Sequence, residues 1–155
     1  MTVAEKLVAL LKAQGLTCAT AESCTGGGVG SAITAVPGSS AVFAGGVISY
    51  ANEVKRDVLG VKAETLATVG AVSSETAAQM AAGARRLLKT DLAVSLTGIA
   101  GPDGGSEEKP VGLVWFGLAT KDGVRTEKAI FRGDRAKVRE QAVIHALGML
   151  TIGAT

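Results

Sequence analysis

The sequence has few aromatic residues, one histidine and two cysteines, and each shortage excludes something. Aromatic residues make up 3% of the 155 residues, so the hydrophobic core must be built from Ala, Val, Leu and Ile. Cys18 and Cys24 do not form the disulfide framework of a small secreted domain. His145, the only histidine, belongs to no cluster with metal-ligand spacing. We therefore expect catalysis without histidine and without a transition metal.

Charge of one sign and long hydrophobic runs are also scarce. The chain has 16 basic and 14 acidic residues, which are mixed along its length and give a net charge of +2. A basic stripe of the kind that binds duplex nucleic acid is missing. The apolar stretches are far shorter than the roughly 20 residues that span a bilayer, and the first residues lack the pattern of a secretion signal. We therefore expect a cytoplasmic protein that binds neither nucleic acid nor membranes.

Glycine, in contrast, is abundant. The 21 glycines gather at the ends of predicted segments and show no collagen-like period, which is typical of turns and of close backbone approach. A length of 155 residues is near the commonest size of one domain, and no linker, repeat or low-complexity segment interrupts the chain. We expect a single domain over residues 1–155.

Strand and helix signals alternate along the chain. Apolar residues at helical spacing predict helices, and short β-prone runs that end at glycine or polar clusters predict strands. Predicted strands cover Leu16–Ala21, Phe43–Tyr50, Leu92–Leu96, Val111–Thr120 and Val124–Phe131. Predicted helices cover Val3–Gln14, a stretch that ends near Pro37, Glu53–Leu59 behind an Asn52 cap, a helix that Ser73 or Ser74 caps with Leu87 and Leu88 on its apolar face, and Arg135–Leu150.

The order of these elements predicts the fold class. The last two strands are joined by an Asp122-Gly123 turn, which favours an antiparallel hairpin. The alternation before them favours parallel strands with crossover helices. We expect an α/β fold of three layers, α/β/α, with a mixed sheet. Ligands of such sheets usually meet the loops at the carboxyl ends of strands, here the turns after Ala21, Tyr50 and Leu96.

The turn after Ala21 places Ser23 between a strand and a helix. Free N–H groups and the helix dipole at such a position stabilise an oxyanion or a phosphate, so Ser23 is a candidate nucleophile. The alternative is that Ser23 or a neighbouring threonine only caps the helix. The glycine pattern does not complete a dinucleotide or phosphate-loop fingerprint. Candidate oxyanion and substrate contacts come from the backbone of Cys24, Thr25, Gly26 and Gly27.

The turn after Tyr50 offers a phenol, Tyr50, and an amine, Lys55, near the start of a short helix. Burial and the positive end of a helix dipole both lower a lysine pKa. A neutral Lys55 would be able to act as a general base. The alternative is a solvated lysine on a charged surface helix.

The segment Thr97–Gly105 follows a buried strand and is rich in glycine, so the backbone at Gly98 and Gly101 can approach a ligand closely. A flexible crossover is the alternative. Basic residues near the start of the last helix are candidate phosphate ligands, although such residues are usually just solvated. They are Arg132, Arg135 and Arg139.

Four segments taken together resemble one family. They read TAESCTGG at Thr20–Gly27, GGVISYANEVKRDVLGV at Gly45–Val61, GAVSSETAAQMA at Gly70–Ala81 and LTGIAGPDGGSEEKPVGLVWF at Leu96–Phe116. In this order they resemble the carboxy-terminal domain of the competence/damage-inducible CinA proteins, whose stand-alone members are nicotinamide mononucleotide deamidases. The resemblance covers nearly the whole chain, from about Leu7 to Leu150.

The resemblance implies hydrolysis of the nicotinamide mononucleotide carboxamide to nicotinic acid mononucleotide and ammonia, by a homodimer or larger assembly without cofactor. It implies Ser23 as nucleophile, assisted by Lys55 and Tyr50, with Thr97 near the reacting group. It also implies that an arginine of the last helix, either Arg135 or Arg139, binds the substrate phosphate. Two alternatives stay open: a non-catalytic module that binds a nucleotide, and an amidase for another small amide.

Overall fold

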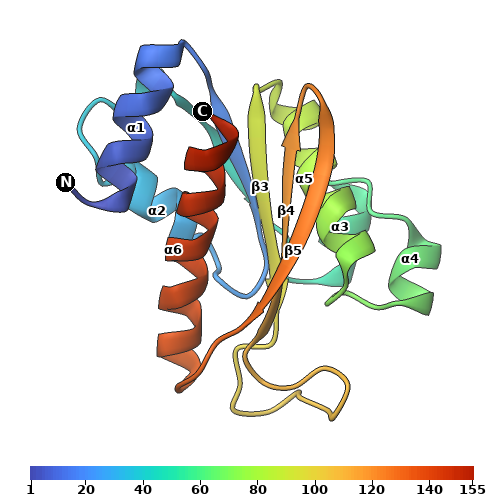
Figure 1. The fold of residues 1–155 in the computed structure, drawn as a ribbon. Helices are drawn as coiled ribbons and strands as arrows, with labels where there is room; N and C mark the ends of the chain where they lie inside the picture. The colour runs from blue at the N-terminus through green and yellow to red at the C-terminus, as the bar shows by residue number, and fades with distance from the viewer.

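The computed structural model describes residues 1–155 and has a five-stranded sheet with the strand order β2-β1-β3-β4-β5 (Figure 1). Strand β1 (Cys18–Glu22) pairs in parallel with both β2 (Phe43–Ile48) and β3 (Leu92–Gly98). Strands β4 (Leu113–Thr120) and β5 (Gly123–Ile130) continue the sheet in antiparallel pairing. The predicted mixed sheet is confirmed.

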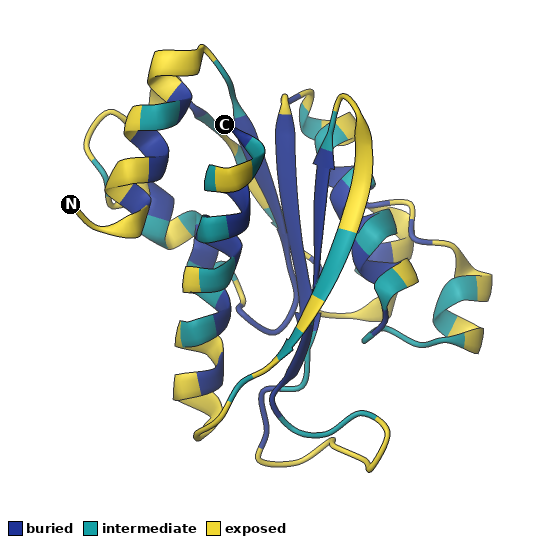
Figure 2. Ribbon diagram, viewed as in Figure 1, coloured by how far each residue is buried: buried dark blue, intermediate teal, exposed yellow.

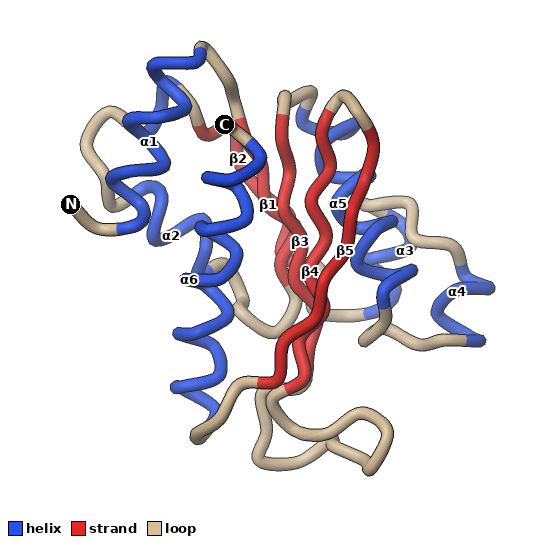
Figure 3. The backbone as a smooth tube through the Cα atoms, viewed as in Figure 1, coloured by secondary structure: helices blue, strands red, loops and turns tan.

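Helices lie on both faces of this sheet (Figure 3). One face carries α1 (Val3–Gln14), α2 (Gly28–Thr34) and α6 (Arg135–Gly153). The other carries α3 (Asn52–Asp57), α4 (Ala63–Thr68) and α5 (Ser74–Leu88). A short 3₁₀ helix, Ser39–Ala41, precedes β2. The three-layer fold is as predicted, and no helix combines the length and apolar character needed to cross a membrane.

Two hydrophobic clusters hold the layers together, and the central strands are buried from both sides (Figure 2). The larger cluster lies between the sheet and α1, α2 and α6, and includes Leu11, Val94, Phe116 and Leu150. The smaller one lies under α5 and contains mainly Ala, Val and Leu. Small side chains permit close packing there, since a Cβ at Gly83 would collide with a backbone carbonyl of the preceding segment. The core is mainly aliphatic, as predicted. Phe116 is the one aromatic residue that is fully buried in it.

Several boundaries differ from the predictions. Asn52 is not the cap of α3, because Ala51 holds that position without a side-chain hydrogen bond and Asn52 is the first helical residue. Leu87 is 49% exposed and so lies outside the buried face of α5, whereas Ser73 caps that helix as expected. The helix α4 was not predicted, since its short amphipathic pattern spans hardly more than one turn.

The ends of the strands differ as well. Thr97 and Gly98 are the last residues of β3 rather than the start of a loop, because they pair with Trp115 and Val114. The hairpin turn has Lys121 and Asp122 at its centre, and Gly123 already pairs with Thr120. Neither central residue has a positive φ, whereas Gly123 has a φ of 130°. The glycine is therefore needed after the turn and not within it.

Candidate active site

The carboxyl ends of β1, β2 and β3 meet at one edge of the sheet because these strands are parallel. A cleft of about 190 Å³ opens there between the segments that follow them. It is lined by Ser23, Cys24, Tyr50, Asn52, Lys55, Ala71, Val72, Thr97, Gly98, Ala100 and Arg135. A larger groove of about 780 Å³ on the helical layer is mainly apolar and contains none of the predicted site residues. The chemistry predicted from the sequence therefore gathers in the smaller cleft.

Lys55 and Ser23 meet inside this cleft. The Nζ atom of Lys55 lies 3.1 Å from Ser23 Oγ, 2.7 Å from the Ser49 carbonyl oxygen and 3.2 Å from that of Tyr50. Lys55 is 1% exposed and Ser23 is 8% exposed, so the alternative of a solvated surface lysine is wrong. The backbone that follows β2 holds the amine in the cleft, because the Ser49 and Tyr50 carbonyl oxygens accept hydrogen bonds from Nζ.

Burial favours the neutral form of Lys55. Desolvation lowers the pKa of this amine from its ordinary value of 10.5, and no carboxylate forms an ion pair with it to oppose the shift. A neutral amine has two N–H donors and one lone pair. The carbonyl groups of Ser49 and Tyr50 account for the two donors. The lone pair is then free to accept the Ser23 hydroxyl proton.

Glu22, which the sequence analysis missed, organises the turn after β1. Its carboxylate is buried and accepts hydrogen bonds from Val29 N (2.9 Å), Gly30 N (3.0 Å) and Thr25 Oγ1 (2.6 Å). The amino end of α2 is thus already occupied by a negative group, which disfavours a substrate anion at that place. Neither Ser23 nor Thr25 caps the helix, because Gly27 holds the cap position.

Only part of the predicted turn faces the cleft. Cys24 lines it, whereas Thr25, Gly26 and Gly27 do not. The N–H of Gly26 donates to the Ser23 carbonyl oxygen at 3.1 Å, but no hydrogen bond within the chain uses the N–H of Cys24 or Thr25. These two amides directly follow the serine, and of the two residues only Cys24 lines the cleft. Burial also raises the pKa of the Cys24 thiol to about 11, so this side chain is a neutral wall of the cleft.

Tyr50 and Arg135 form the outer wall of the cleft. Tyr50 is 64% exposed, and its hydroxyl accepts a hydrogen bond from Arg135 Nη2 at 3.4 Å. Its carbonyl group, not its hydroxyl, contacts Lys55. Arg135 Nη1 also donates to the Gly101 carbonyl oxygen at 2.8 Å, which ties α6 to the segment after β3. Gly101 therefore positions the arginine without lining the cleft itself.

The remaining predicted residues have distinct places. Thr97 lines the cleft beside Gly98 and donates from Oγ1 to the Ala71 carbonyl oxygen at 2.8 Å. Arg139 does not line the cleft, and its guanidinium donates to carbonyl groups of the Ser23 turn. Arg132 is exposed outside the cleft. Of the three candidate arginines, the structure brings only Arg135 to the site.

The cleft also contains residues that sequence reasoning missed. Asn52 faces it from the first turn of α3, and Ala71, Val72 and Ala100 complete the wall. Small apolar residues carry no chemical signal of their own. Asn52 lies between Tyr50 and Lys55 in the sequence, and this position could have indicated that it lines the site. The sequence analysis predicted a helix cap there instead.

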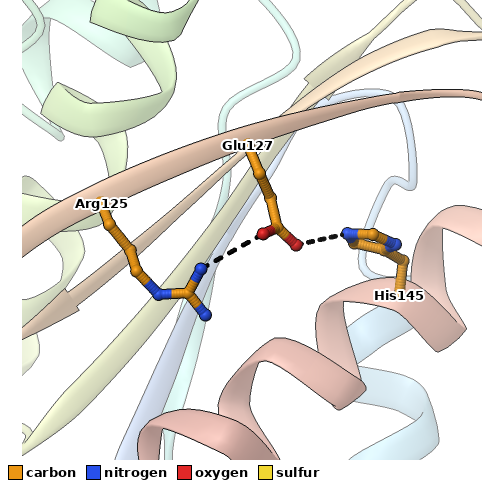
Figure 4. Close-up of polar contacts among 3 residues, drawn as sticks. All are labelled: Arg125, Glu127 and His145. Atoms are coloured by element: carbon orange, nitrogen blue, oxygen red, sulfur yellow. Dashed lines mark hydrogen bonds and ion pairs between the residues drawn. The ribbon is translucent and has the colours of Figure 1, made fainter.

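His145 lies outside the cleft. Its Nε2 is 2.7 Å from Glu127 Oε1, and Arg125 Nη1 donates to the other oxygen of Glu127 at 3.2 Å (Figure 4). The imidazole ring also packs on Phe116, with ring centroids 4.2 Å apart. The only histidine is therefore a packing and hydrogen-bonding residue between β5 and α6, and no group of His, Cys, Asp and Glu has the arrangement of a metal site.

Comparison with known proteins agrees with this fold. The model of the CinA C-terminal domain matches residues 1–152. The nicotinamide-nucleotide amidohydrolase PncC of Escherichia coli is 52% identical over 151 residues, which are 97% of this chain and 92% of that protein. A putative competence-damage inducible protein of Halothermothrix orenii is 60% identical over 131 residues, 84% of this chain but only 32% of its own length.

A solved structure shows the same fold. The competence/damage inducible protein CihA from Agrobacterium tumefaciens superposes with a TM-score of 0.94 and 45% sequence identity, over 98% of this chain and 93% of that one. A family model that matches almost every residue, together with these relatives, shows that the chain belongs to the CinA C-terminal domain family.

Proposed function

We propose that this protein hydrolyses the carboxamide of nicotinamide mononucleotide to nicotinic acid mononucleotide and ammonia, with Ser23 as nucleophile. The observation that carries the proposal is the buried contact of 3.1 Å between Lys55 Nζ and Ser23 Oγ, in a cleft without a counter-ion for the amine. The 52% identity to the Escherichia coli amidohydrolase supports the choice of substrate.

The first half of the reaction follows from these positions. Neutral Lys55 takes the Ser23 hydroxyl proton while Oγ attacks the carboxamide carbon. The negative charge that develops on the carbonyl oxygen meets the free N–H groups of Cys24 and Thr25, and one such donor contributes about 3 kcal/mol to transition-state stabilisation. The Lys55 ammonium then gives its proton to the departing nitrogen. Ammonia leaves, and an ester between Ser23 and the nicotinoyl group remains.

The second half returns the enzyme to its starting state. Water attacks the ester carbon, and Lys55, neutral again, accepts a proton from that water. Collapse of the second tetrahedral intermediate releases the carboxylate product, and Ser23 Oγ recovers its proton from Lys55. Tyr50 was predicted to relay or donate a proton. Its hydroxyl bonds to Arg135, so we place its contribution at the outer wall, on the bound nucleotide.

The size of the cleft indicates how the substrate lies. A volume of about 190 Å³ is below the roughly 300–1,000 Å³ of sites that enclose whole drug-sized ligands. We infer that the carboxamide ring enters the cleft beside Thr97 and Gly98, while ribose and phosphate lie at its mouth. Arg135 is the arginine at that mouth, and a guanidinium binds phosphate through two parallel hydrogen bonds.

The alternatives predict different behaviour. A module that only binds nucleotides has no use for a buried amine held against a serine hydroxyl, because an unpaired buried lysine lowers stability. An amidase for another small amide would be indifferent to the ribose phosphate. Turnover with and without the ribose phosphate therefore separates these three functions.

Ammonia release from nicotinamide mononucleotide by the purified protein tests the proposal. We expect steady turnover by the wild type and a loss of at least about 10³-fold in Ser23→Ala, because Ser23 Oγ is the only hydroxyl that contacts Lys55 Nζ. Thermal unfolding of both proteins is the control for folding. Saturable nucleotide binding without ammonia release would show a binding module, and a folded Ser23→Ala variant with wild-type turnover would exclude the covalent route.

Assembly into a homo-oligomer and a cytoplasmic location are part of the proposal and rest on the family resemblance and on the sequence.

A further inference from the structure

Arg139 was one of two arginines expected to bind a substrate phosphate, but its hydrogen bonds go to the backbone of the Ser23 turn. Its Nε donates to the Cys24 carbonyl oxygen at 3.2 Å, and its Nη2 donates to the Thr25 carbonyl oxygen at 3.2 Å. The side chain thus reaches from α6 to the turn that carries Ser23, 115 residues earlier in the sequence. Its donors face two consecutive carbonyl groups, which the forked guanidinium matches and a lysine ammonium does not.

The two peptides to which these carbonyl groups belong differ in the number of their other hydrogen bonds. The Thr25 carbonyl also accepts from Gly28 N at 3.0 Å, and the amide of Gly26 in the same peptide donates to Ser23 O at 3.1 Å. The peptide between Cys24 and Thr25 has no other partner: nothing else donates to its carbonyl, and its N–H has no acceptor in the chain. Arg139 provides the only hydrogen bond of this peptide.

This peptide follows the nucleophile by one residue. A peptide group is planar and trans, so its C=O and N–H point in opposite directions. The hydrogen bond from Arg139 to the Cys24 carbonyl therefore fixes the direction of the Thr25 N–H, which points away from the guanidinium. That N–H is one of the two donors that the proposed mechanism uses for the oxyanion.

We propose that Arg139 is a positioning residue that holds the Cys24–Thr25 peptide so that the Thr25 N–H is oriented for the oxyanion, and that it does not bind the substrate phosphate. The proposal rests on the proposed function. Glu22 holds the opposite side of the same turn through its hydrogen bonds to α2 and to Thr25 Oγ1. The turn is thus fixed on its donor side by a buried carboxylate and on its acceptor side by Arg139.

Kinetics of Arg139→Ala distinguish positioning from phosphate binding. Loss of one aligned oxyanion donor commonly lowers kcat by about 10²–10³-fold, and partial misalignment should lower it by about 10–100-fold. The KM for nicotinamide mononucleotide should stay within about threefold. The preference for this nucleotide over nicotinamide riboside, which lacks the phosphate, should not change. A raised KM with a lost phosphate preference, or an unchanged kcat, would overturn the proposal.

Two further variants exclude a merely structural effect. Arg139→Lys keeps the charge but reaches one carbonyl at a time, so its kcat should lie between those of the wild type and Arg139→Ala. Guanidinium chloride at low millimolar concentration should restore part of the kcat of Arg139→Ala and none in the wild type. Lys137→Ala, on the same helix with a side chain 67% exposed, is the matched control and should retain wild-type kcat.

Hydrogen exchange provides a readout that needs no substrate. In Arg139→Ala, amide exchange should accelerate in the segment from 23 to 28 and remain at the wild-type rate in β3 and α5. Unchanged exchange in this segment would reject the role of Arg139 even if the wild type releases ammonia. Conversely, a wild type that releases no ammonia would reject the proposed function, while faster exchange in the variant would still support the positioning role.

Discussion

Two groups of ionisable side chains in this molecule differ in how they are compensated. In the cluster of Arg125, Glu127 and His145, every potential charge has a partner, and the side chains are between 32% and 48% exposed (Figure 4). In the cleft, the amine of Lys55 is 1% exposed and faces only neutral oxygen atoms. The first arrangement resembles that of many protein surfaces.

This difference in burial indicates which of the two groups can take part in catalysis. The side chains around Glu127 are partly exposed, so solvent screens their interactions and the cluster contributes little to stability. Lys55 is buried and has no carboxylate partner, so desolvation lowers the pKa of its amine. A buried base next to a hydroxyl is costly to fold and useful in catalysis.

The largest effect is expected when the amine of Lys55 is removed. Lys55→Met keeps a similar length and removes the base, so kcat for ammonia release should fall by about 10²–10⁴-fold, the usual contribution of a positioned general base. Circular dichroism and thermal unfolding establish that the variant is folded. Activity within threefold of the wild type would mean that Lys55 is not the base.

The pH profile of the wild type also tests Lys55 as the base. Only the neutral amine can accept the Ser23 proton, and the ammonium form increases as the pH falls, so kcat/KM should decrease toward low pH. Because burial lowers the pKa of Lys55, the midpoint of this decrease should lie below 10.5. The residual activity of Lys55→Met should lack this dependence. The same dependence in both proteins would assign it to another group.

An intermediate effect is expected at the mouth of the cleft. Arg135→Ala removes the guanidinium proposed to bind phosphate, and a charged hydrogen bond of about 1.5–3 kcal/mol corresponds to a roughly 10–100-fold rise in KM for nicotinamide mononucleotide. The values for nicotinamide riboside should change much less. If both substrates lose activity equally, the contact of Arg135 with Gly101 matters for the structure of the cleft and not for phosphate binding.

The smallest effect is expected in the exposed cluster. Glu127→Gln removes the charge that Arg125 and His145 share, and it should change the free energy of unfolding by less than about 1 kcal/mol, with still less effect at high salt. Ammonia release should equal that of the wild type. Urea titration and the amidase assay measure both quantities. A loss of more than about 2 kcal/mol or a clear loss of activity would remove the contrast between the two groups.

The sequence predicted the alternation of elements well and their ends less well. The range of α1 was predicted correctly and the cap of α5 was narrowed to Ser73 or Ser74, because apolar spacing and cap residues are local signals. The extension of β3 to Gly98 was not, since pairing with β4 decides where a strand ends. Within the site, Ser23, Tyr50, Lys55 and Thr97 were predicted and do line one cleft. Glu22 was missed because a carboxylate in a strand shows its partners only after folding.

The sequence by itself determined the α/β class, the aliphatic core and the three turns that carry polar chemistry, since these follow from local periodicity and composition. Tertiary structure alone decided the rest. It brought Lys55 to Ser23 across 32 residues, turned Arg139 onto a backbone carbonyl and left Arg135 at the cleft. The physical reason is that burial and hydrogen-bond geometry depend on segments far apart in the chain, and these two properties set the pKa of an amine and the direction of an amide.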